Sequence, residues 1–196
     1  MSTAIIGFGA IGQALARAFA RKSIQVVVAS RQGPEAIAPQ AQAIGPTVTA
    51  RSLQDALKAQ IVILAIPFSE IAGLASLTDW RGKTVVDPTN AINFPDFTPA
   101  DLGGKSSSSL VQVTLSGAQV VKAFNTIPAA ILAQSPEEDG GRRVVFLSGD
   151  AADARKEVST LIDELGFATM DLGSLQDGAL QQCFQPLWAK NLILKG

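Results

Sequence analysis

The chain of 196 residues contains no histidine and no tyrosine, and these absences exclude several kinds of redox site. Without tyrosine, the tyrosine–lysine proton donor of short-chain dehydrogenases cannot be built. Without histidine, neither the histidine–carboxylate relay of lactate and malate dehydrogenases nor an ordinary zinc alcohol dehydrogenase site can form. A redox enzyme with this sequence must manage with little proton transfer from side chains, and we assign no catalytic residue.

Cysteine, net charge and long apolar runs are also scarce. The single Cys183 excludes an internal disulfide and a cysteine metal cluster, so no metal site is expected and a reducing cytoplasm is the simplest setting. A net charge of −1 gives no electrostatic reason to expect nucleic acid or an anionic membrane as a partner. The longest uninterrupted apolar run, IVILAIPF, is too short to span a bilayer.

Apolar strand patterns alternate with helical patterns along most of the chain, which predicts an α/β protein with a mostly parallel sheet. We expect strands at residues 2–6, 25–30, 47–50, 61–67, 83–89, 118–124, 144–149 and 167–173. We expect helices at 10–22, 40–44, 52–59, 69–77, about 106–115, 128–133 and 150–166, and one or two more within 175–194. Residues 90–108 are mostly irregular, and PEEDGGRR is expected to be a solvated turn. Ser52 and Asp150 are the expected helix caps, and Gly166 the expected helix stop.

The segment GFGAIG follows the first strand and matches the pattern G-x-G-x-x-G. Gly7 would permit the tight turn, Gly9 the close approach of a pyrophosphate, and Gly12 the close packing of helix on strand. Phe8, Ala10 and Ile11 complete the loop, and the free N–H groups of the following helix favour an anion. The alternative is that the glycines serve only a tight strand–helix turn. The order strand, loop, helix, strand favours a dinucleotide-binding Rossmann fold, doubly wound.

The second strand ends in VVVASRQG, where a carboxylate usually binds the adenosine ribose. Ser30 lies 18 residues after Gly12, so the register fits but the carboxylate is missing. A serine hydroxyl and the guanidinium of Arg31 would bind a 2′-phosphate instead. The alternative is that Arg31 is a solvated loop residue. The sequence favours NADP(H) over NAD(H) as the cofactor.

Further segments add to this motif and suggest a family. In order they are VVVASR, AIPFSE, KAFNTIPAAIL, LSGDAADARKEVSTLIDELGF and DLGSLQDGALQQ. With the glycine loop they resemble the family of NADP oxidoreductases that depend on coenzyme F420, a deazaflavin. The resemblance implies an NADP-binding Rossmann domain at residues 1–125. It also implies a small C-terminal α/β extension at 126–196 that completes the substrate pocket and helps to form a homodimer.

The resemblance also implies a set of site residues. Ala65, Ile66, Pro67 and Phe68, together with Pro88, Thr89, Asn90 and Ala91, would lie along the cofactor. Asn125, Thr126, Ile127 and Pro128 would form the pocket for the second ring system, and Leu172 and Leu175 would close it. Several of these are expected strand ends, where ligands bind in parallel sheets. The alternative for each is a structural loop with a rigid proline. Lys122 can equally be a strand residue with a solvated head, and we do not assign it a catalytic role.

The sequence departs from the family pattern at two places. Archaeal members often have a histidine where Asn125 stands, which affects the contact with the deazaflavin. Members can also carry a further basic residue after the Ser-Arg pair, where this chain has Gly33–Pro34–Glu35. The same pattern occurs in the cytoplasmic reductase domains of membrane ferric reductases, which bind flavin.

Together these features suggest hydride transfer between NADPH and a small-molecule acceptor, either coenzyme F420 or a flavin. Two alternatives stay open. One is an NADPH-dependent reductase of a small imine or carbonyl substrate, of the pyrroline-carboxylate type. The other is a non-catalytic NADP(H)-binding protein.

Overall fold

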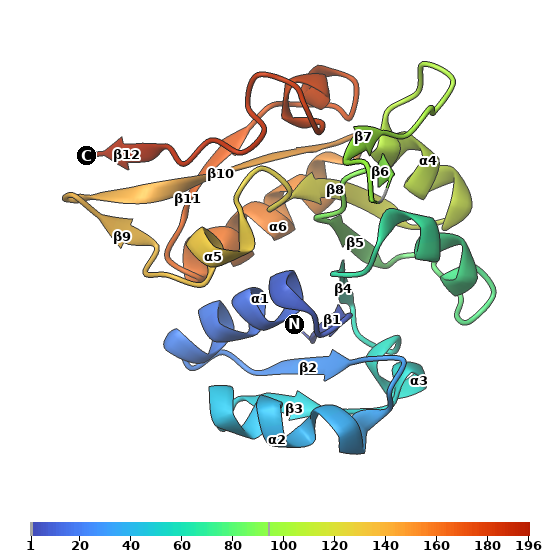
Figure 1. Cartoon of the computed structure of the whole chain (residues 1–196), viewed down its shortest axis with the longest axis vertical. Helices are drawn as coiled ribbons and strands as arrows, with labels where there is room; N and C mark the ends of the chain where they lie inside the picture. Colours follow the sequence, from blue (N-terminus) through green and yellow to red (C-terminus); the bar gives the residue numbers. More distant parts are fainter. Residues whose placement is uncertain (1, 94) are drawn as a thin grey trace.

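The computed structural model describes residues 2–93 and 95–196. The main sheet is built from β1 (Thr3–Ile6), β2 (Val26–Ala29), β3 (Val48–Ala50), β4 (Ile61–Leu64), β5 (Thr84–Asp87), β8 (Gln119–Ala123), β10 (Gly141–Gly149) and β11 (Ala168–Asp171). Their order in space is β11-β10-β8-β5-β4-β1-β2-β3 (Figure 1). The six strands β3, β2, β1, β4, β5 and β8, which are neighbours in this order, run parallel to one another. β10 pairs with β8 in the antiparallel direction.

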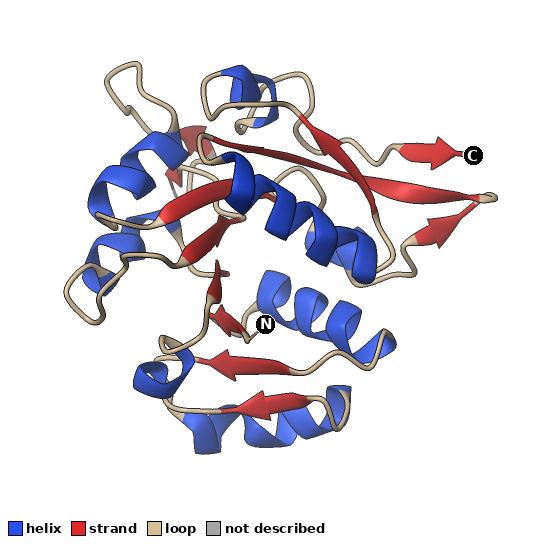
Figure 2. Cartoon of the chain, turned by 180° about the vertical axis from the view of Figure 1, so that it is seen from behind, coloured by secondary structure: helices blue, strands red, loops and turns tan. Residues whose placement is uncertain are grey.

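Helices cover both faces of this sheet (Figure 2). They are α1 (Ala10–Arg21), α2 (Pro34–Ile44), α3 (Leu53–Ala56), α4 (Ser107–Thr114), α5 (Ala129–Leu132) and α6 (Ala152–Glu164), with the 3₁₀ helices η1 (Phe68–Leu74) and η2 (Asp177–Gln181). One apolar core joins α1, α2, α5 and α6 to one face, and a second core joins α3, η1 and α4 to the other. β1, β4 and β5 are buried throughout, as expected for aliphatic strands covered on both faces. The expected doubly wound α/β fold is confirmed.

The C-terminal third extends the same sheet. β10 pairs with β11, with β9 (Glu137–Glu138) and with β12 (Ile193–Lys195). PEEDGGRR is therefore not just a turn: it contains a strand pair around Asp139–Gly140, and Arg143 within it is buried. Residues 175–194 were expected to be helical, but they contain only η2 before β12 begins.

Four local expectations also differ from the structure. The helix expected at 40–44 begins at Pro34, because proline fits the first helical position, where no N–H partner is needed. The segment 68–74 is a 3₁₀ helix rather than an α-helix, and residues 90–108 include the short pair β6 (Ile92–Asn93) and β7 (Thr98–Pro99). Asp150 does not cap α6: its carboxylate accepts the N–H of Leu175 at 3.0 Å.

Two other expectations about helix ends are confirmed. The Ser52 hydroxyl accepts the N–H of Asp55 at the start of α3, and Gly166 follows α6 with a φ of +94°. Among the helices in the described ranges, none combines the length and apolar character that crossing a membrane requires.

Candidate functional site

The loop between β1 and α1 has the geometry of a phosphate cradle. Gly7 has a φ of +100°, and a Cβ there would lie 2.1 Å from the carbonyl oxygen of Ala65. A Cβ on Gly12 would lie 2.1 Å from the Gly7 carbonyl oxygen, so the first turn of α1 packs directly on the loop. A Cβ on Gly9 would meet no atom within 4 Å. The loop is thus tight on its protein side and open at Gly9, at the N-terminus of a helix with no acidic residue in its first turn.

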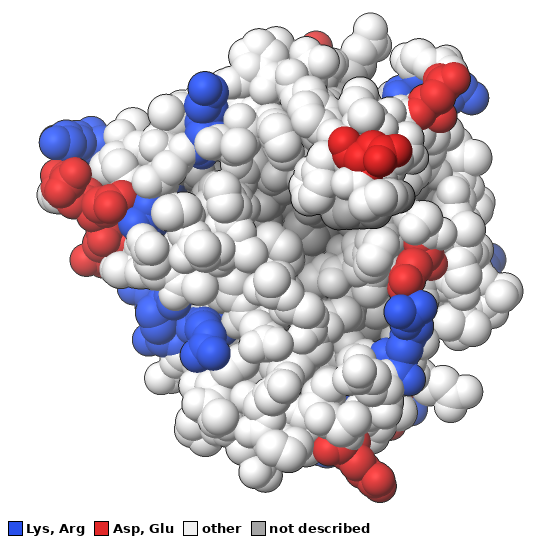
Figure 3. All heavy atoms as spheres, in the orientation of Figure 1, with Lys and Arg blue, Asp and Glu red and all other residues white. Residues whose placement is uncertain are grey.

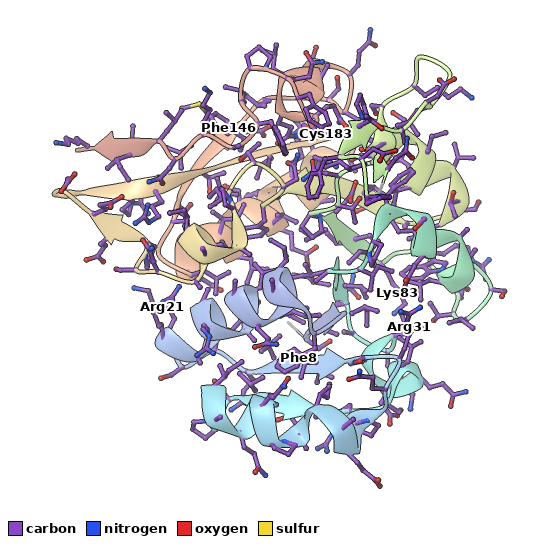
Figure 4. All side chains as sticks on the ribbon, viewed as in Figure 1. Phe8, Arg21, Arg31, Lys83, Phe146 and Cys183 are labelled. Atoms are coloured by element: carbon purple, nitrogen blue, oxygen red, sulfur yellow. The ribbon has the colours of Figure 1, made fainter. Side chains whose placement is uncertain are left out.

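A cavity of about 560 Å³, which we call the Arg31 cavity, opens beside this loop. Gly7, Phe8 and Gly9 line it on one side, and Ser30 and Arg31 line it at the end of β2. Arg31 lies beyond the end of β2, beside α3 (Figure 4). The remaining wall comes from Leu53 and from the segment that follows β4, including Ala65, Ile66, Pro67, Ser69 and Glu70. The structure therefore brings the Ser-Arg pair and the glycine loop to one cavity.

Arg31 makes an ion pair across this cavity. Its Nη1 lies 3.0 Å from Oε1 of Glu70, and the side chains of Arg31 and Glu70 are 81% and 30% exposed. The Ser30 hydroxyl accepts the N–H of Gln32 at 3.2 Å, which leaves its own proton free to donate. Both side chains can thus bind an anionic group that enters the cavity.

A second cavity of about 440 Å³, the Pro88 cavity, lies on the other side of the turn after β4. Both cavities share Ala65, Ile66 and Pro67. The Pro88 cavity is lined by Ala10, Ile11, Leu64, Ala65, Ile66, Pro67, Phe68, Pro88, Thr89, Asn90 and Ile92. None of these residues carries a titratable side chain. The face of the molecule drawn in Figure 3 has a hollow near its middle, and most of the residues around this hollow are uncharged.

The loop after β5 is held from behind by a buried polar network. The ammonium group of Lys122 lies 3.2 Å from Oδ2 of Asp87 and donates to the carbonyl oxygen of Thr89 at 2.6 Å. Asp87 also accepts the hydroxyls of Ser108 and Thr89, at 2.5 and 2.7 Å. The side chains of Asp87 and Lys122 are completely buried, so the alternative in which Lys122 has a solvated head is wrong. The network fixes Pro88 and Thr89 at the wall of the Pro88 cavity.

Asn125 is buried and bonded on both sides. Its side-chain amide donates to the Asn90 side-chain oxygen at 3.2 Å and to the Gln181 carbonyl oxygen in η2 at 2.6 Å. The Asn90 amide donates in return to the Asn125 backbone oxygen at 3.1 Å. The preceding Phe124 is buried with a φ of +64°, a left-handed conformation that costs free energy for a bulky residue. Asn125 thus ties the loop beside the Pro88 cavity to the C-terminal segment.

The residues expected to form the acceptor pocket do not line the cavities described so far. Thr126 and Ile127 are buried, and Pro128 is exposed at the start of α5. Leu175 is buried next to Asp150, whereas Leu172 packs with Phe146 in a small apolar cluster on the C-terminal sheet. Of the expected cofactor residues, Gly12 lines neither cavity, because it packs against the backbone of Gly7.

Ala91 lines a third cavity of about 510 Å³, together with Cys183 and with Ser106 and Ser107 at the start of α4. Burial raises the pKa of the Cys183 thiol, and the positive charge of Lys122 offsets part of this effect. The thiol lies 3.7 Å from the carbonyl oxygen of Ala91. Cys183 is accordingly less ionised at neutral pH than an exposed cysteine.

Sequence reasoning missed Glu70, Asp87 and Gln181. Glu70 stood within the segment AIPFSE, but nothing in a single sequence indicates that it faces Arg31. Asp87 ends an apolar strand, where a charge indicates that a partner is needed, but the sequence does not identify Lys122 as that partner. Gln181 acts through its backbone oxygen, for which the sequence has no signal.

Known proteins resemble the chain over different parts of its length. The sequence model of the family described as NADP oxidoreductase, coenzyme F420-dependent, matches residues 2–91. A crystal structure of the hypothetical protein SMa0349 from Sinorhizobium meliloti is 47% identical, with a TM-score of 0.96, over 100% of this chain and 96% of that one. The metalloreductase STEAP3 of Rattus norvegicus is 31% identical over 87% of this chain, which spans only 33% of that protein.

A further crystal structure carries the family assignment over most of the chain. It shows a protein assigned as an F420-dependent NADP-reductase of Arthrobacter sp. FB24. It is 30% identical, with a TM-score of 0.76, over 91% of this chain and 87% of that one. The glycine loop and the Ser-Arg strand end lie within the part that the family model matches. The chain belongs to the family of coenzyme F420-dependent NADP oxidoreductases.

Proposed function

We propose that this member of the NADP oxidoreductases transfers a hydride between NADP(H) and a deazaflavin or flavin ring. The observation that carries the proposal is the lining of the Pro88 cavity, where none of the described residues has a side chain that titrates near neutral pH. Hydride transfer to a carbonyl or a neutral imine leaves a strongly basic oxygen or nitrogen, which needs a proton donor close by as the hydride arrives. A deazaflavin or flavin spreads the added negative charge over its ring system, so its proton can come later from water.

The residues around the loop fit NADP(H). The open space at Gly9 and the N-terminus of α1 suit the pyrophosphate, because N–H groups and the helix dipole favour negative charge there. Ser30 and Arg31 suit the 2′-phosphate, because the guanidinium can make charge-assisted hydrogen bonds to it. The Pro88 cavity, on the far side of the Ala65–Pro67 turn, would then receive the nicotinamide.

The work of the protein in this reaction is to orient two rings and exclude water. When bound, NADPH supplies the hydride and the acceptor ring takes it, so the chemistry belongs to the ligands. Ala10, Ile11, Phe68 and Pro88 give the cavity apolar walls. The Lys122–Asp87 network and the Asn90–Asn125 pair keep its loops in position. Orientation of this kind can lower a barrier by several kcal/mol, up to about 7–11 kcal/mol in the best intramolecular cases.

The acceptor is tested by following the absorbance of NADPH with several acceptors in parallel: coenzyme F420, FMN, FAD, a ferric chelate and a cyclic imine. We expect turnover with coenzyme F420 or a flavin. Turnover with the imine alone would instead support a small-substrate reductase. Tight NADPH binding without turnover on any acceptor would indicate a non-catalytic NADP(H)-binding protein, and either result would refute the proposal.

A further inference from the structure

The Arg31–Glu70 pair spans the place where the cofactor would enter. Arg31 follows β2, and Glu70 lies in η1 after β4. In the sheet, β1 lies between β4 and β2, and the glycine loop follows β1. Arg31 and Glu70 therefore come from segments that follow the two neighbours of β1, and both line the Arg31 cavity together with Gly7 and Gly9 of the loop.

The pair is held loosely. The side chain of Arg31 is 81% exposed, so water and salt weaken its attraction to the Glu70 carboxylate. Glu70 itself is 30% exposed and faces the cavity together with Ser30, Gly7 and Gly9. A stronger anion that reaches the guanidinium can therefore take it from Glu70, but the carboxylate then remains beside that anion.

We infer that Glu70 weakens the preference for NADP(H) over NAD(H) by competing with the 2′-phosphate of NADP(H) for Arg31. This inference rests on the proposed function. A 2′-phosphate carries a charge of about −1.5 to −2, as phosphate monoesters do near neutral pH. Its binding separates Arg31 from Glu70 and adds repulsion from the carboxylate. NADH has a neutral hydroxyl at the same position, so it incurs neither penalty. Glu70 therefore lowers the preference for NADPH over NADH that Ser30 and Arg31 create.

The test is a direct binding measurement on the full chain, with the fluorescence of NADPH and of NADH as the readout. The variants are Glu70→Gln, Arg31→Ala and the double variant. Glu137→Gln serves as a matched control, because it removes the same charge from a residue in β9, far from the cavity in the sheet. Thermal unfolding of each variant shows whether its fold is intact.

Glu70→Gln should lower the Kd for NADPH about two- to fivefold, the range expected for loss of an exposed ion pair, and leave the Kd for NADH unchanged. The gain should shrink at high salt, and it should be clearly smaller when Arg31 is alanine, because only the repulsion between the carboxylate and the phosphate then remains to be removed. Glu137→Gln should change neither Kd.

Four results would overturn the inference. Unchanged or weaker NADPH binding by Glu70→Gln would show that Glu70 does not compete. An equal gain for both cofactors would remove the link to the 2′-phosphate, and a full gain without Arg31 would remove the competition. In these three cases the proposed function stands. If the wild-type chain bound neither cofactor, the proposed function would fail and the inference with it.

Discussion

At the residue scale, the three glycines of the phosphate loop meet different constraints. Gly7 and Gly12 have backbone oxygen atoms 2.1 Å from the position of a Cβ, so any side chain there must displace the loop or α1. Gly9 has open space instead. Packing within the chain thus explains two of the glycines, whereas at Gly9 no packing contact excludes a side chain and the space is open for the proposed pyrophosphate.

This contrast predicts different outcomes for two alanine variants. Gly12→Ala should lower the free energy of unfolding by about 1–3 kcal/mol or more, as overpacking against rigid backbone does, and should also impair NADPH binding. Gly9→Ala should change stability by less than about 1 kcal/mol, since a poorer helix cap and a less flexible unfolded chain act in opposite directions. It should nevertheless weaken NADPH binding at least about tenfold, because its methyl group occupies the approach of the pyrophosphate.

Urea unfolding and NADPH titration of the two variants provide the measurement. Each variant serves as the control for the other, because both add one methyl group to the same loop. Wild-type affinity for NADPH in Gly9→Ala would remove the loop from the cofactor site.

At the scale of elements, β5 and β8 are joined by a buried ion pair as well as by their backbone hydrogen bonds. Asp87 and Lys122 occupy paired positions in the parallel register, and both side chains are completely buried. Burial of two charges is favourable only while each keeps its partner and its hydrogen bonds. The Asp87–Lys122 pair therefore affects both the stability of the sheet and the position of the loop that lines the Pro88 cavity.

Asp87→Asn should lower the free energy of unfolding by about 3–5 kcal/mol, because it leaves the Lys122 ammonium group buried without its counter-charge. Lys122→Met should also be costly, whereas the double variant should cost clearly less than the sum of the two. Urea unfolding of the three variants measures this coupling. Asp79→Asn, which breaks the exposed pair with Arg81, is the control and should hardly change stability. Additive costs for Asp87 and Lys122 would argue against a coupled pair.

How well the sequence predicted an element depended on how far apart along the chain its interacting residues lie. The unit β1–α1–β2 and the cap at Ser52 follow from neighbouring residues, and both were predicted. Asp150 was expected to cap the helix next to it, but its partner is Leu175, 25 residues away. A solvated head on Lys122 stayed open as an alternative, because its partner Asp87 lies 35 residues earlier. Local pattern cannot reveal which distant group a buried side chain meets.

At the scale of the whole molecule, the expected cofactor residues could be placed from the sequence more easily than the expected acceptor residues. Most of the expected cofactor residues line the two neighbouring cavities, because the carboxyl ends of parallel strands meet at one edge of the sheet. That rule follows from strand order alone. The expected acceptor residues depend on how the C-terminal segment docks on β8 and β10, and no strand rule fixes this. There the structure places Asn125 against Gln181 and leaves Leu172 in a separate cluster.

The C-terminal segment also exposes apolar side chains, and we propose that two copies of the chain pair through them. Met170 in β11 and Leu194 in β12 are 41% and 47% exposed, and Leu192, directly before β12, is 42% exposed. Apolar side chains that gather on one surface commonly mark a contact between proteins, and most homo-oligomers are two-fold dimers.

Sedimentation velocity should therefore give twice the mass of the chain for the wild type, and Leu194→Glu should shift the population to the monomer. Val113→Glu is the matched control, because Val113 is 76% exposed on α4, away from β11 and β12 (Figure 1), and its substitution should leave the dimer intact. If both variants sediment as dimers, the contact lies elsewhere, and a monomeric wild type would contradict the dimer itself.

Because Asn125 and Gln181 link this segment to the Pro88 cavity, a dimer formed here would also hold one wall of the site in place. Leu194→Glu should then lower turnover in proportion to the fraction of monomer, while NADPH binding at the glycine loop stays unchanged.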